Sequence, residues 1–547
     1  MKPTAPRPPA ALLALWLVPL VCHGAFSWIG FNPTDDGWLQ AIARRLLDGQ
    51  IPHRDFISVR PVLSAALQIP LAAWGGDHVF WLARLWGWFE IGALAWLWSG
   101  FLAPALPAVR ATLFGLVLVL TAHTFPVMAW HTLDGLLICS AAVALARRGT
   151  VAAWVGAFFL GGLATLARQN FVFFLPFLAL GLPHPRLWPV TLAAGCAPAL
   201  YGLFLAFAGA LPDFLQQLTA TRGALFVVAV VHPLQTPAVW VGLALGLGSA
   251  VALLRSRTLS PRTGARLDAT FHFATATATA VCLWHGPTLF PSAAYALLAF
   301  VLALALGALC ARRLDPTTRL LTASALGLAW SALISSGYNH PALASGVLFV
   351  VLWHLAALLG GREFSAPRPV RLAGFTAVAL LAVSLWHARR AFPYGDKPAR
   401  ELTYEAGTAL RGATGLSTNR VTHEALLELQ ALTTSLAAQG RPYAIFTDYS
   451  AHWVNDSRRN PLDCEWPQST ELALSPELYG RFAERLFRLP PDTVLIAQRH
   501  VTSLHAIDLV PVDAASQFYL LQCRLIPHAR LLSGGQYFEL YTLPRLP

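Results

Sequence analysis

Apolar segments long enough to cross a membrane follow one another along most of this chain, separated by short loops. Hydrophobic residues make up 56% of its 547 residues and charged residues only 12%, whereas a soluble domain carries about 25% charged residues. An apolar run of about 20 residues crosses a bilayer as a helix, because a helix satisfies its backbone hydrogen bonds internally. We therefore predict an α-helical polytopic membrane protein in which residues 1–390 form about 13 spans.

The distribution of basic residues predicts how the chain is oriented. Cytoplasmic loops of membrane proteins are enriched in lysine and arginine. Met1–Pro9 contains Lys2 and Arg7, so we expect a cytoplasmic N-terminus, a retained first span over Ala10–Phe31 and a first loop on the outer face. The loops that fall inside on this scheme hold most of the other arginines before the tail. Topology thus explains the net charge of +12, and we expect no nucleic-acid partner.

The polar C-terminal part, residues 391–547, is large enough to form a domain with its own core. We predict an α/β domain on the periplasmic face of the membrane. Cys464 and Cys523 lie in it and can form a disulfide if that compartment is oxidising. The patterns predict helices over Val421–Ala438 and Pro476–Arg488, strands over Tyr443–Asp448 and Thr493–Ala497, and a hairpin turn at Gly534–Gly535.

The first loop, residues 32–61, is too densely charged to lie in hydrocarbon. Apolar residues recur in it at helical spacing beside Arg44 and Arg45, which predicts an amphipathic helix lying along the membrane surface. Gly49 and Pro52 then end this helix. The apolar positions are Trp38, Leu39, Ile42, Leu46 and Leu47.

Two adjacent carboxylates, Asp35 and Asp36, open this loop. Aspartate favours the first turn of a helix, so one interpretation is that they cap the helix that follows. The functional interpretation is that one of them is a catalytic base for an acceptor hydroxyl or amine, while the other orients the acceptor or binds a divalent cation. The two interpretations are compatible.

Basic residues at the other end of the loop suit an anionic ligand. Arg54 and Arg60 carry guanidinium groups that bind phosphate in a bidentate manner, and a lipid-linked donor presents its phosphate at this depth. We assign His53 and Asp55 to the same substrate-binding region. The alternative for each arginine is contact with lipid head groups.

Further polar clusters fall on the outer face in this scheme. Arg168 lies between two predicted spans and is a third candidate for phosphate binding. Tyr338, Asn339 and His340 form a later loop that could contact substrate. Inside the spans, Glu90 is either functional or paired with another span. Asp134 is a weaker candidate on the outer face.

The residues of the first loop resemble a known family. An Asp-Asp pair soon after the first span is followed by Ala-Arg-Arg-Leu-Leu-Asp-Gly-Gln-Ile-Pro-His-Arg-Asp-Phe and by Arg60-Pro61. This pattern resembles the multispanning glycosyltransferases with the C-type fold, which include protein mannosyltransferases and lipid A aminoarabinose transferases. The segment Gly161–Asn170 is similar to a span end common in bacterial members.

The resemblance implies an inverting glycosyltransferase of the bacterial inner membrane that uses a polyprenyl-phosphate sugar. By position, Asp35 or Asp36 would be the base and Arg60 would hold the lipid phosphate. Family members place a metal-binding glutamate near that basic residue, whereas this chain has Ser58-Val59, which leaves the divalent cation open. The acceptor would be a glycan, lipid or protein on the periplasmic face.

Two other classes of function are compatible with the sequence. A transporter or flippase of lipid-linked sugars would show repeated halves and polar residues at mid-membrane, and neither is visible here. A non-catalytic envelope assembly protein with a periplasmic domain is the other. Replacement of both Asp35 and Asp36 by Asn separates these classes, because only a transferase loses turnover while it still folds.

Overall fold

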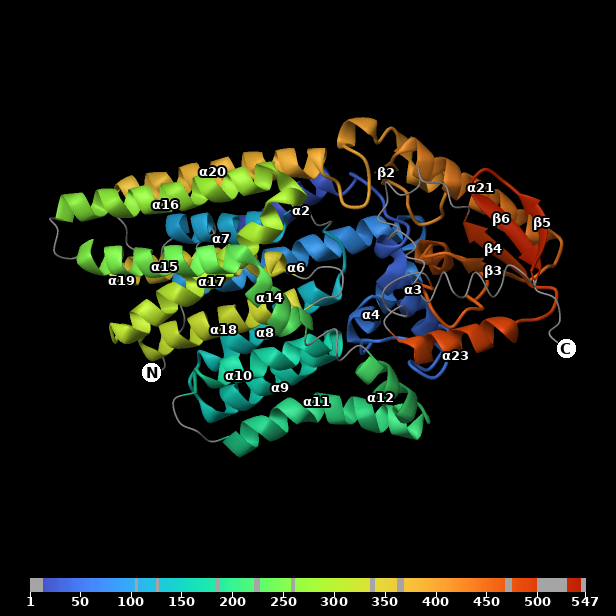
Figure 1. Cartoon of the computed structure of the whole chain (residues 1–547), viewed down its shortest axis with the longest axis horizontal. Helices are drawn as coiled ribbons and strands as arrows, with labels where there is room; N and C mark the ends of the chain where they lie inside the picture. The colour runs from blue at the N-terminus through green and yellow to red at the C-terminus, as the bar shows by residue number, and fades with distance from the viewer. Residues whose placement is uncertain are drawn as a thin grey trace.

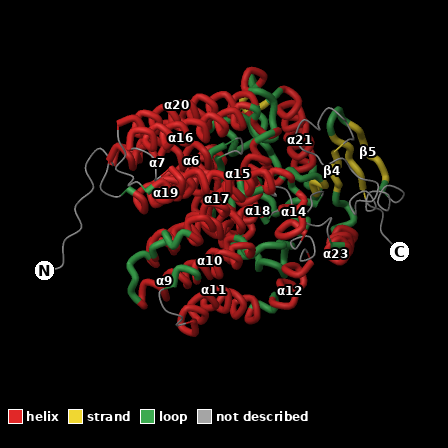
Figure 2. The backbone as a smooth tube through the Cα atoms, turned by 60° about the vertical axis from the view of Figure 1, so that its left-hand side comes forward, coloured by secondary structure: helices red, strands yellow, loops and turns green. Residues whose placement is uncertain are grey.

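The helices of this protein gather in one bundle, and a mixed helix and sheet region covers one end of it (Figures 1 and 2). A computed structural model describes residues 13–103, 107–123, 127–182, 187–220, 227–256, 261–334, 340–361, 368–467, 475–498 and 529–542. The bundle helices are α2 (Leu17–Phe26), α6 (Val79–Leu102), α7 (Pro107–Thr121), α8 (His131–Ala146), α9 (Val151–Ala167), α10 (Phe174–Ala179), α11 (Leu187–Phe207), α15 (Pro237–Ser256), α16 (Pro261–Trp284), α17 (Phe290–Cys310), α18 (Pro316–Leu333), α19 (Ser345–Gly360) and α20 (Arg368–Ala391).

Membrane-spanning character is supported for part of the bundle. Among the described residues, four helices are long and apolar enough to cross a membrane. The prediction of about 13 spans is therefore not confirmed. The four helices are Trp188–Phe207, Pro237–Ser256, Phe290–Cys310 and Ala342–Gly360.

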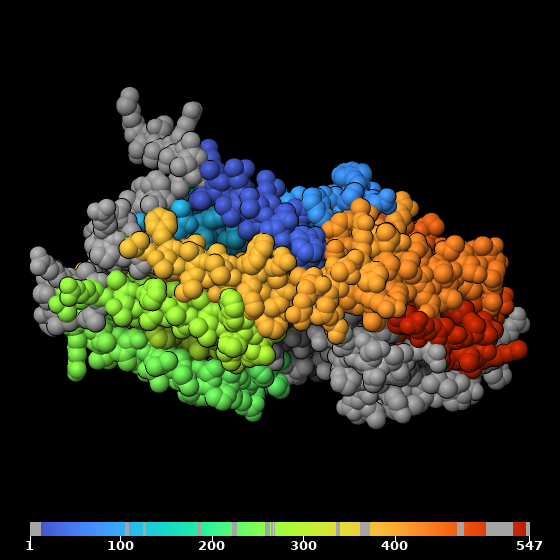
Figure 3. Space-filling view, turned by 90° about the horizontal axis from the view of Figure 1, so that it is seen from above, coloured from blue at the N-terminus to red at the C-terminus, as the bar shows by residue number. Residues whose placement is uncertain are grey.

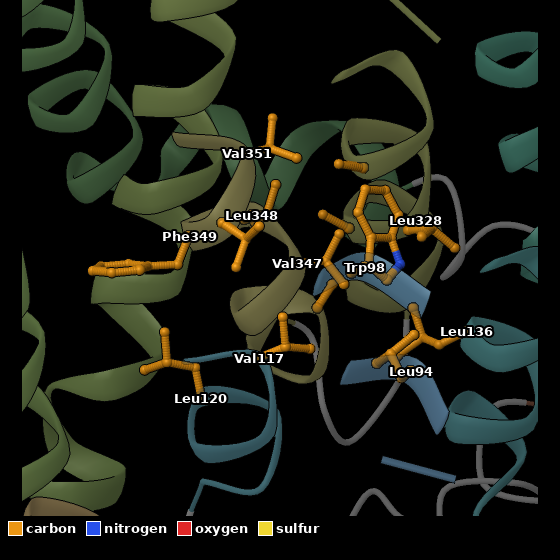
Figure 4. Packing of buried hydrophobic residues seen from close by; sticks show 14 of the residues in the cluster. Leu94, Trp98, Val117, Leu120, Leu136, Leu328, Val347, Leu348, Phe349 and Val351 are labelled. Carbon is orange, nitrogen blue, oxygen red and sulfur yellow. The ribbon is translucent and has the colours of Figure 1, made fainter. Parts of the chain in front are cut away.

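The centre of the bundle is formed by a helix that is apolar on all sides. In α19, Val347, Leu348 and Phe349 are all buried, and they pack against residues of α6 and α7 such as Trp98 and Val117 (Figure 4). A helix that is hydrophobic all round must be surrounded by other apolar helices or by lipid. By contrast, α11 lies at the edge of the bundle with most of its apolar side chains exposed (Figure 1).

The first span is shorter than the sequence suggested. The helical part, 3-10 turn η1 (Ala14–Trp16) followed by α2, ends at Phe26, whereas we expected it to reach Phe31. The chain leaves the helix after Phe26, where the carbonyl groups of Ser27, Ile29 and Gly30 accept hydrogen bonds from the side chain of Arg84, as described below. A buried guanidinium thus replaces the hydrogen bonds that the last helical turn would have formed.

Helix α3 (Asp35–Leu47) forms where the sequence predicted a helix, but it does not lie freely on a membrane surface. Nine of its 13 residues are buried, because the helix is enclosed between the bundle and the C-terminal domain. At Gly37 an added Cβ would lie 2.2 Å from the Cα atom of Ala451. The prediction of an amphipathic surface helix is therefore wrong, since both faces of α3 are covered by protein.

The C-terminal region contains the predicted elements. Helices α21 (Arg420–Ala438) and α23 (Pro476–Phe487) flank a four-stranded sheet of order β3-β4-β6-β5. Strands β3 and β4 are parallel, and β6 pairs antiparallel with both β4 and β5. The predicted hairpin turn joins β5 to β6. The strands are β3 (Tyr443–Phe446), β4 (Val494–Gln498), β5 (Arg530–Gly534) and β6 (Phe538–Thr542).

One buried carboxylate fastens the C-terminal region to the first loop. Asp396 accepts hydrogen bonds from the backbone N–H of Phe31, the hydroxyl of Thr418 and the amide of Asn419, at 3.0, 2.8 and 2.7 Å. In the view from above, α20 and the start of the C-terminal region form one continuous surface (Figure 3). The polar region is thereby fixed on the end of the bundle that carries α3.

The predicted disulfide and several short elements remain to be described. Cys464 is buried, and Cys523, its predicted partner, lies outside the described residues. The short elements used below are α4 (Leu63–Leu67), α5 (Ile69–Trp74), α12 (Leu211–Ala220), 3-10 turn η3 (Gln169–Phe173), 3-10 turn η6 (Ala342–Ala344) and 3-10 turn η9 (Ser450–Val454).

Candidate functional site

The two adjacent carboxylates of the first loop have different surroundings. Asp36 is buried and forms a bidentate ion pair with Arg84 of α6, with N–O distances of 3.1 and 2.8 Å. The other N–H groups of Arg84 donate to the carbonyl oxygens of Ser27, Ile29 and Gly30. All five guanidinium N–H groups therefore have acceptors. The Asp36–Arg84 pair closes the start of the loop as a structural clamp, and it leaves Asp35 as the better candidate for the base.

Asp35 is half-buried and faces a different partner. The hydroxyl of Tyr394, which follows α20, donates a hydrogen bond to its carboxylate. Tyr394 and Arg389 line a recess between α2, α6 and the end of α20, which we call the Tyr394 recess. Its lining residues are Phe26, Ser27, Ile29, Arg84, Trp88, Val127, Arg389, Pro393 and Tyr394.

Arg389 adds a positive charge to the Tyr394 recess. Its guanidinium carbon lies 5.9 Å from the centre of the Trp88 ring, and its side chain is 7% exposed. Arg389 and His340 both lie near His123, which follows α7. His340 therefore lies in the same region, and burial lowers its pKa to about 4. A histidine with this pKa is neutral at pH 7 and can accept or donate a hydrogen bond, but it carries no charge.

Arg60 belongs to a second recess beside α3. Its guanidinium carbon lies 4.9 Å from the centre of the Trp38 ring, a distance at which a cation is attracted to the indole face. Trp38 also stacks on Trp466 of the C-terminal region, with the two ring centroids 4.7 Å apart. We call this hollow the Arg60 recess. Its lining residues are Trp38, Leu39, Ile42, Ser58, Arg60, Pro61, Val62, Ser64, Ala65, His131 and Ala167.

Arg168 lies near the Arg60 recess. The charges of Arg60 and Arg168 both act on His131, the first residue of α8. Arg168 donates to the hydroxyl of Thr132 at 2.6 Å and to the carbonyl of Ile334 at 2.8 Å, which fixes it at the N-terminus of α8. A helix N-terminus carries a partial positive charge. The structure thus brings together two guanidinium groups and a helix N-terminus, an arrangement that favours an anion.

The other predicted residues of the first loop lie in a separate environment. His53 has a backbone φ of 69°, and its ring nitrogens bond to Gln217 of α12 at 3.0 Å and to Tyr201 of α11 at 2.8 Å. Burial lowers the pKa of His53 to about 4. Arg481 donates to the carbonyl groups of His53 and Arg54, both at 2.8 Å. This turn is a structural connection between the bundle, α12 and α23.

Arg54 and Asp55 pair with each other in that turn. The Nε atom of Arg54 lies 2.8 Å from a carboxylate oxygen of Asp55, and the Arg54 side chain is 47% exposed. The hydrogen bond from Arg54 lowers the pKa of Asp55. Both residues bond to the segment after α11, to α23 and to the loop itself rather than to either recess. The structure does not place them with Asp35 and Arg60.

The remaining predictions concern a later loop and a metal. Tyr338 and Asn339 lie outside the described residues, so their role stays a prediction. Within the described ranges, no group of three or more His, Cys, Asp or Glu side chains is arranged to hold a metal ion.

The sequence analysis did not single out Tyr394 and Arg389, which line the Tyr394 recess, or Trp466, which stacks on Trp38 beside the Arg60 recess. Tyr394 and Arg389 follow the last predicted span, where no candidate residue was predicted. Arg389-Arg390 lies on the predicted outer side of that span, against the usual inside bias of arginine, and this exception was an available signal. The contact of the Trp466 indole was not predictable, because Trp466 lies 428 positions after Trp38 and no local pattern links the two.

Comparison with known proteins adds no relative. No family model matches the chain, and no curated protein or solved structure is significantly similar to it.

Proposed function

We propose that this protein is an inverting glycosyltransferase that moves a sugar from a polyprenyl-phosphate carrier to an acceptor at the end of the bundle that carries α3. The observation that carries the proposal is the position of Asp35 relative to Arg60. Asp35 and Trp38 are three residues apart on α3 and so share one face of it. The guanidinium of Arg60 covers the Trp38 ring. The carboxylate of Asp35 and the guanidinium of Arg60 thus both lie beside the first turn of α3.

Each residue has a distinct role in the proposed reaction. The carboxylate of Asp35 accepts the proton of the acceptor hydroxyl or amine as that group attacks the anomeric carbon. The bond between this carbon and the phosphate oxygen of the carrier breaks, and the configuration inverts. Arg60 and Arg168 stabilise the negative charge that builds on the departing polyprenyl phosphate. Tyr394 orients the Asp35 carboxylate through its hydrogen bond.

Polar and membrane features support a lipid-linked donor. The Arg60 recess combines a guanidinium with aromatic and aliphatic side chains, a lining suited to a phosphate attached to an isoprenoid chain. Apolar helices surround the same end of the bundle, so the carrier can remain in the bilayer. We place the protein in the bacterial inner membrane with this end facing the periplasm.

The test follows transfer directly. Purified protein is incubated with a radiolabelled polyprenyl-phosphate sugar and a crude acceptor fraction, and release of free polyprenyl phosphate is measured. Asp35→Asn should reduce release by about a thousandfold while the unfolding midpoint stays unchanged. Asp77→Asn, a change at an exposed carboxylate near the same end, is the matched control. Full turnover by Asp35→Asn would refute the assignment of the base.

A further inference from the structure

Two carboxyl groups meet inside the bundle, away from the residues assigned above. Glu90 on α6 is 6% exposed and Asp134 on α8 is 1% exposed. Their side chains lie within hydrogen-bonding reach of each other. The sequence left open whether Glu90 is functional or paired with another span, and its partner is a second acid rather than a base.

The surroundings of this pair supply few donors. The indole of Trp86 lies within reach of Glu90, and the hydroxyl of Ser64 within reach of Asp134. Among the described residues, both oxygens of Asp134 and the Oε2 atom of Glu90 are buried without a donor in good hydrogen-bond geometry. Neither acid forms an ion pair within the described part of the chain. The pair therefore lacks a hydrogen-bond donor between the two carboxyl groups.

Electrostatics decides what that donor is. Two ionised carboxylates in contact repel strongly in a buried site, so such pairs retain one proton between them. A divalent cation is the alternative, but Mg²⁺ or Ca²⁺ requires six or more oxygen ligands. Two carboxylates and one hydroxyl do not provide that number in a closed interior. A single shared proton removes one of the two negative charges and also supplies the hydrogen-bond donor between the two carboxyl groups.

We propose that Glu90 and Asp134 share a single proton and that this pair positions Arg60. Ser64 belongs to α4, which begins three residues after Arg60, and both residues line the same recess. The protonated pair joins α6 to α8, and the Ser64 hydroxyl of α4 lies within reach of Asp134 while it donates to the carbonyl of Ala167 at 3.5 Å. On this proposal, the position of Arg60 depends on the hydrogen bond between the protonated Glu90–Asp134 pair, which lies next to α4. The relevance to catalysis rests on the proposed function, but the shared proton does not.

Loss of the proton has a defined consequence. At high pH the second negative charge drives Glu90 and Asp134 apart and loosens α4. Other titratable or charged groups lie on the elements packed against α6 and α8, and they must be held constant in the comparison. They are Arg60 before α4, His23 on α2, Asp77 and His78 before α6, Arg84 on α6, Arg110 on α7, His123 after α7, His131 on α8, Arg168 at the end of α9, Arg319 on α18, His340 before η6 and His354 on α19.

Infrared spectroscopy tests the shared proton without any substrate. The spectrum of the wild-type protein minus that of Glu90→Gln/Asp134→Asn, recorded at pH 7 in detergent, should contain the C=O stretch of one protonated carboxyl. The band should disappear as the pH is raised. A difference spectrum with only carboxylate bands at pH 7 would overturn the proposal. If the double variant does not fold, Glu90→Gln and Asp134→Asn are measured singly, and the C=O band of the wild type should be lost or shifted in both.

The positioning role is tested by stability and by binding. Glu90→Gln keeps a permanent neutral donor, so its unfolding midpoint should not change on the alkaline side, whereas the wild-type midpoint should fall as the pH rises. Equal pH profiles would overturn the positioning role. Binding of a short-chain polyprenyl phosphate should weaken with rising pH in the wild type alone. If neither protein binds this lipid at any pH, the proposed function fails, while the unfolding comparison still decides the role of the pair.

Discussion

The two charged ends of the first loop look alike in sequence and differ in the structure. At residues 32–36, Asp36 is locked to Arg84 while Asp35 beside it faces Tyr394 and the Tyr394 recess. At residues 53–55, the charges of Arg54 and Asp55 satisfy each other at the surface, and arginines of α23 hold the backbone. The first end borders a small recess, and the second end connects parts of the protein.

The difference teaches that charge density alone does not locate a site. A side chain whose donors and acceptors are all satisfied by the protein cannot also bind a ligand without breaking those bonds. By this criterion Arg84 is structural although it is fully buried at the centre of the region. Arg60 differs because it lines a recess and lies against the aromatic face of Trp38. The predictions below test this contrast.

The largest effect is expected at the clamp. Arg84→Met leaves the Asp36 carboxylate buried without its counter-charge, which costs about 3–5 kcal/mol of folding stability. The measurement is the unfolding midpoint and the yield of folded protein in detergent. Adding Asp36→Leu to the same protein removes the buried charge, and part of the lost stability should return. A double variant no more stable than Arg84→Met would show that the carbonyl contacts of Arg84 dominate.

The next effect concerns binding rather than folding. Arg60→Ala should weaken binding of polyprenyl phosphate by about 10- to 100-fold, because a hydrogen bond to a charged group contributes about 1.5–3 kcal/mol. Arg60→Lys keeps the charge and should retain part of the affinity. Binding is followed by quenching of tryptophan fluorescence, since Trp38 lies against the guanidinium. Unchanged affinity in Arg60→Ala would remove Arg60 from the donor site.

A smaller effect is expected from His53 at the second end of the loop, where it makes the folding stability depend on pH. His53 has a pKa of about 4 in the folded protein, below the value of about 6.5 for an unfolded chain. Between these values the unfolded state binds more protons, so stability falls as the pH falls through this window. Between pH 7 and pH 5 the loss is about 2 kcal/mol.

A substitution at the same position isolates this contribution. His53→Asn tolerates the positive φ of this position and has no titrating ring. Its unfolding midpoint should depend less on pH between 7 and 5 than that of the wild type. Parallel profiles for the two proteins would mean that another group causes the acid sensitivity.

The smallest effect is expected at the surface pair. Arg54→Ala removes an exposed guanidinium that pairs with its neighbour in the chain, and such pairs contribute little in water. We expect no measurable change in polyprenyl phosphate affinity or in the unfolding midpoint. A loss of affinity similar to that of Arg60→Ala would place Arg54 in the donor site and remove the contrast between the two ends.

Much of the secondary structure was predictable, because it depends on local periodicity. The helix over Val421–Ala438 starts one residue earlier in the structure, and the predicted strands and the glycine hairpin are present. The burial of both faces of α3 was not predictable. The pattern of apolar and basic residues in α3 fits a membrane surface as well as it fits an enclosed helix, and only the contact with Ala451 separates the two.

The sequence by itself determined that this is a largely helical protein with membrane-spanning character and a small polar C-terminal domain, because hydrophobicity and its period are properties of neighbouring residues. Only the tertiary structure decided which charged side chains pair with side chains from distant segments and which line a recess. Arg84 reaches back to Asp36, Tyr394 reaches Asp35 and Glu90 meets Asp134. Hydrogen bonds and burial between distant segments set these pairings, and no local pattern encodes them.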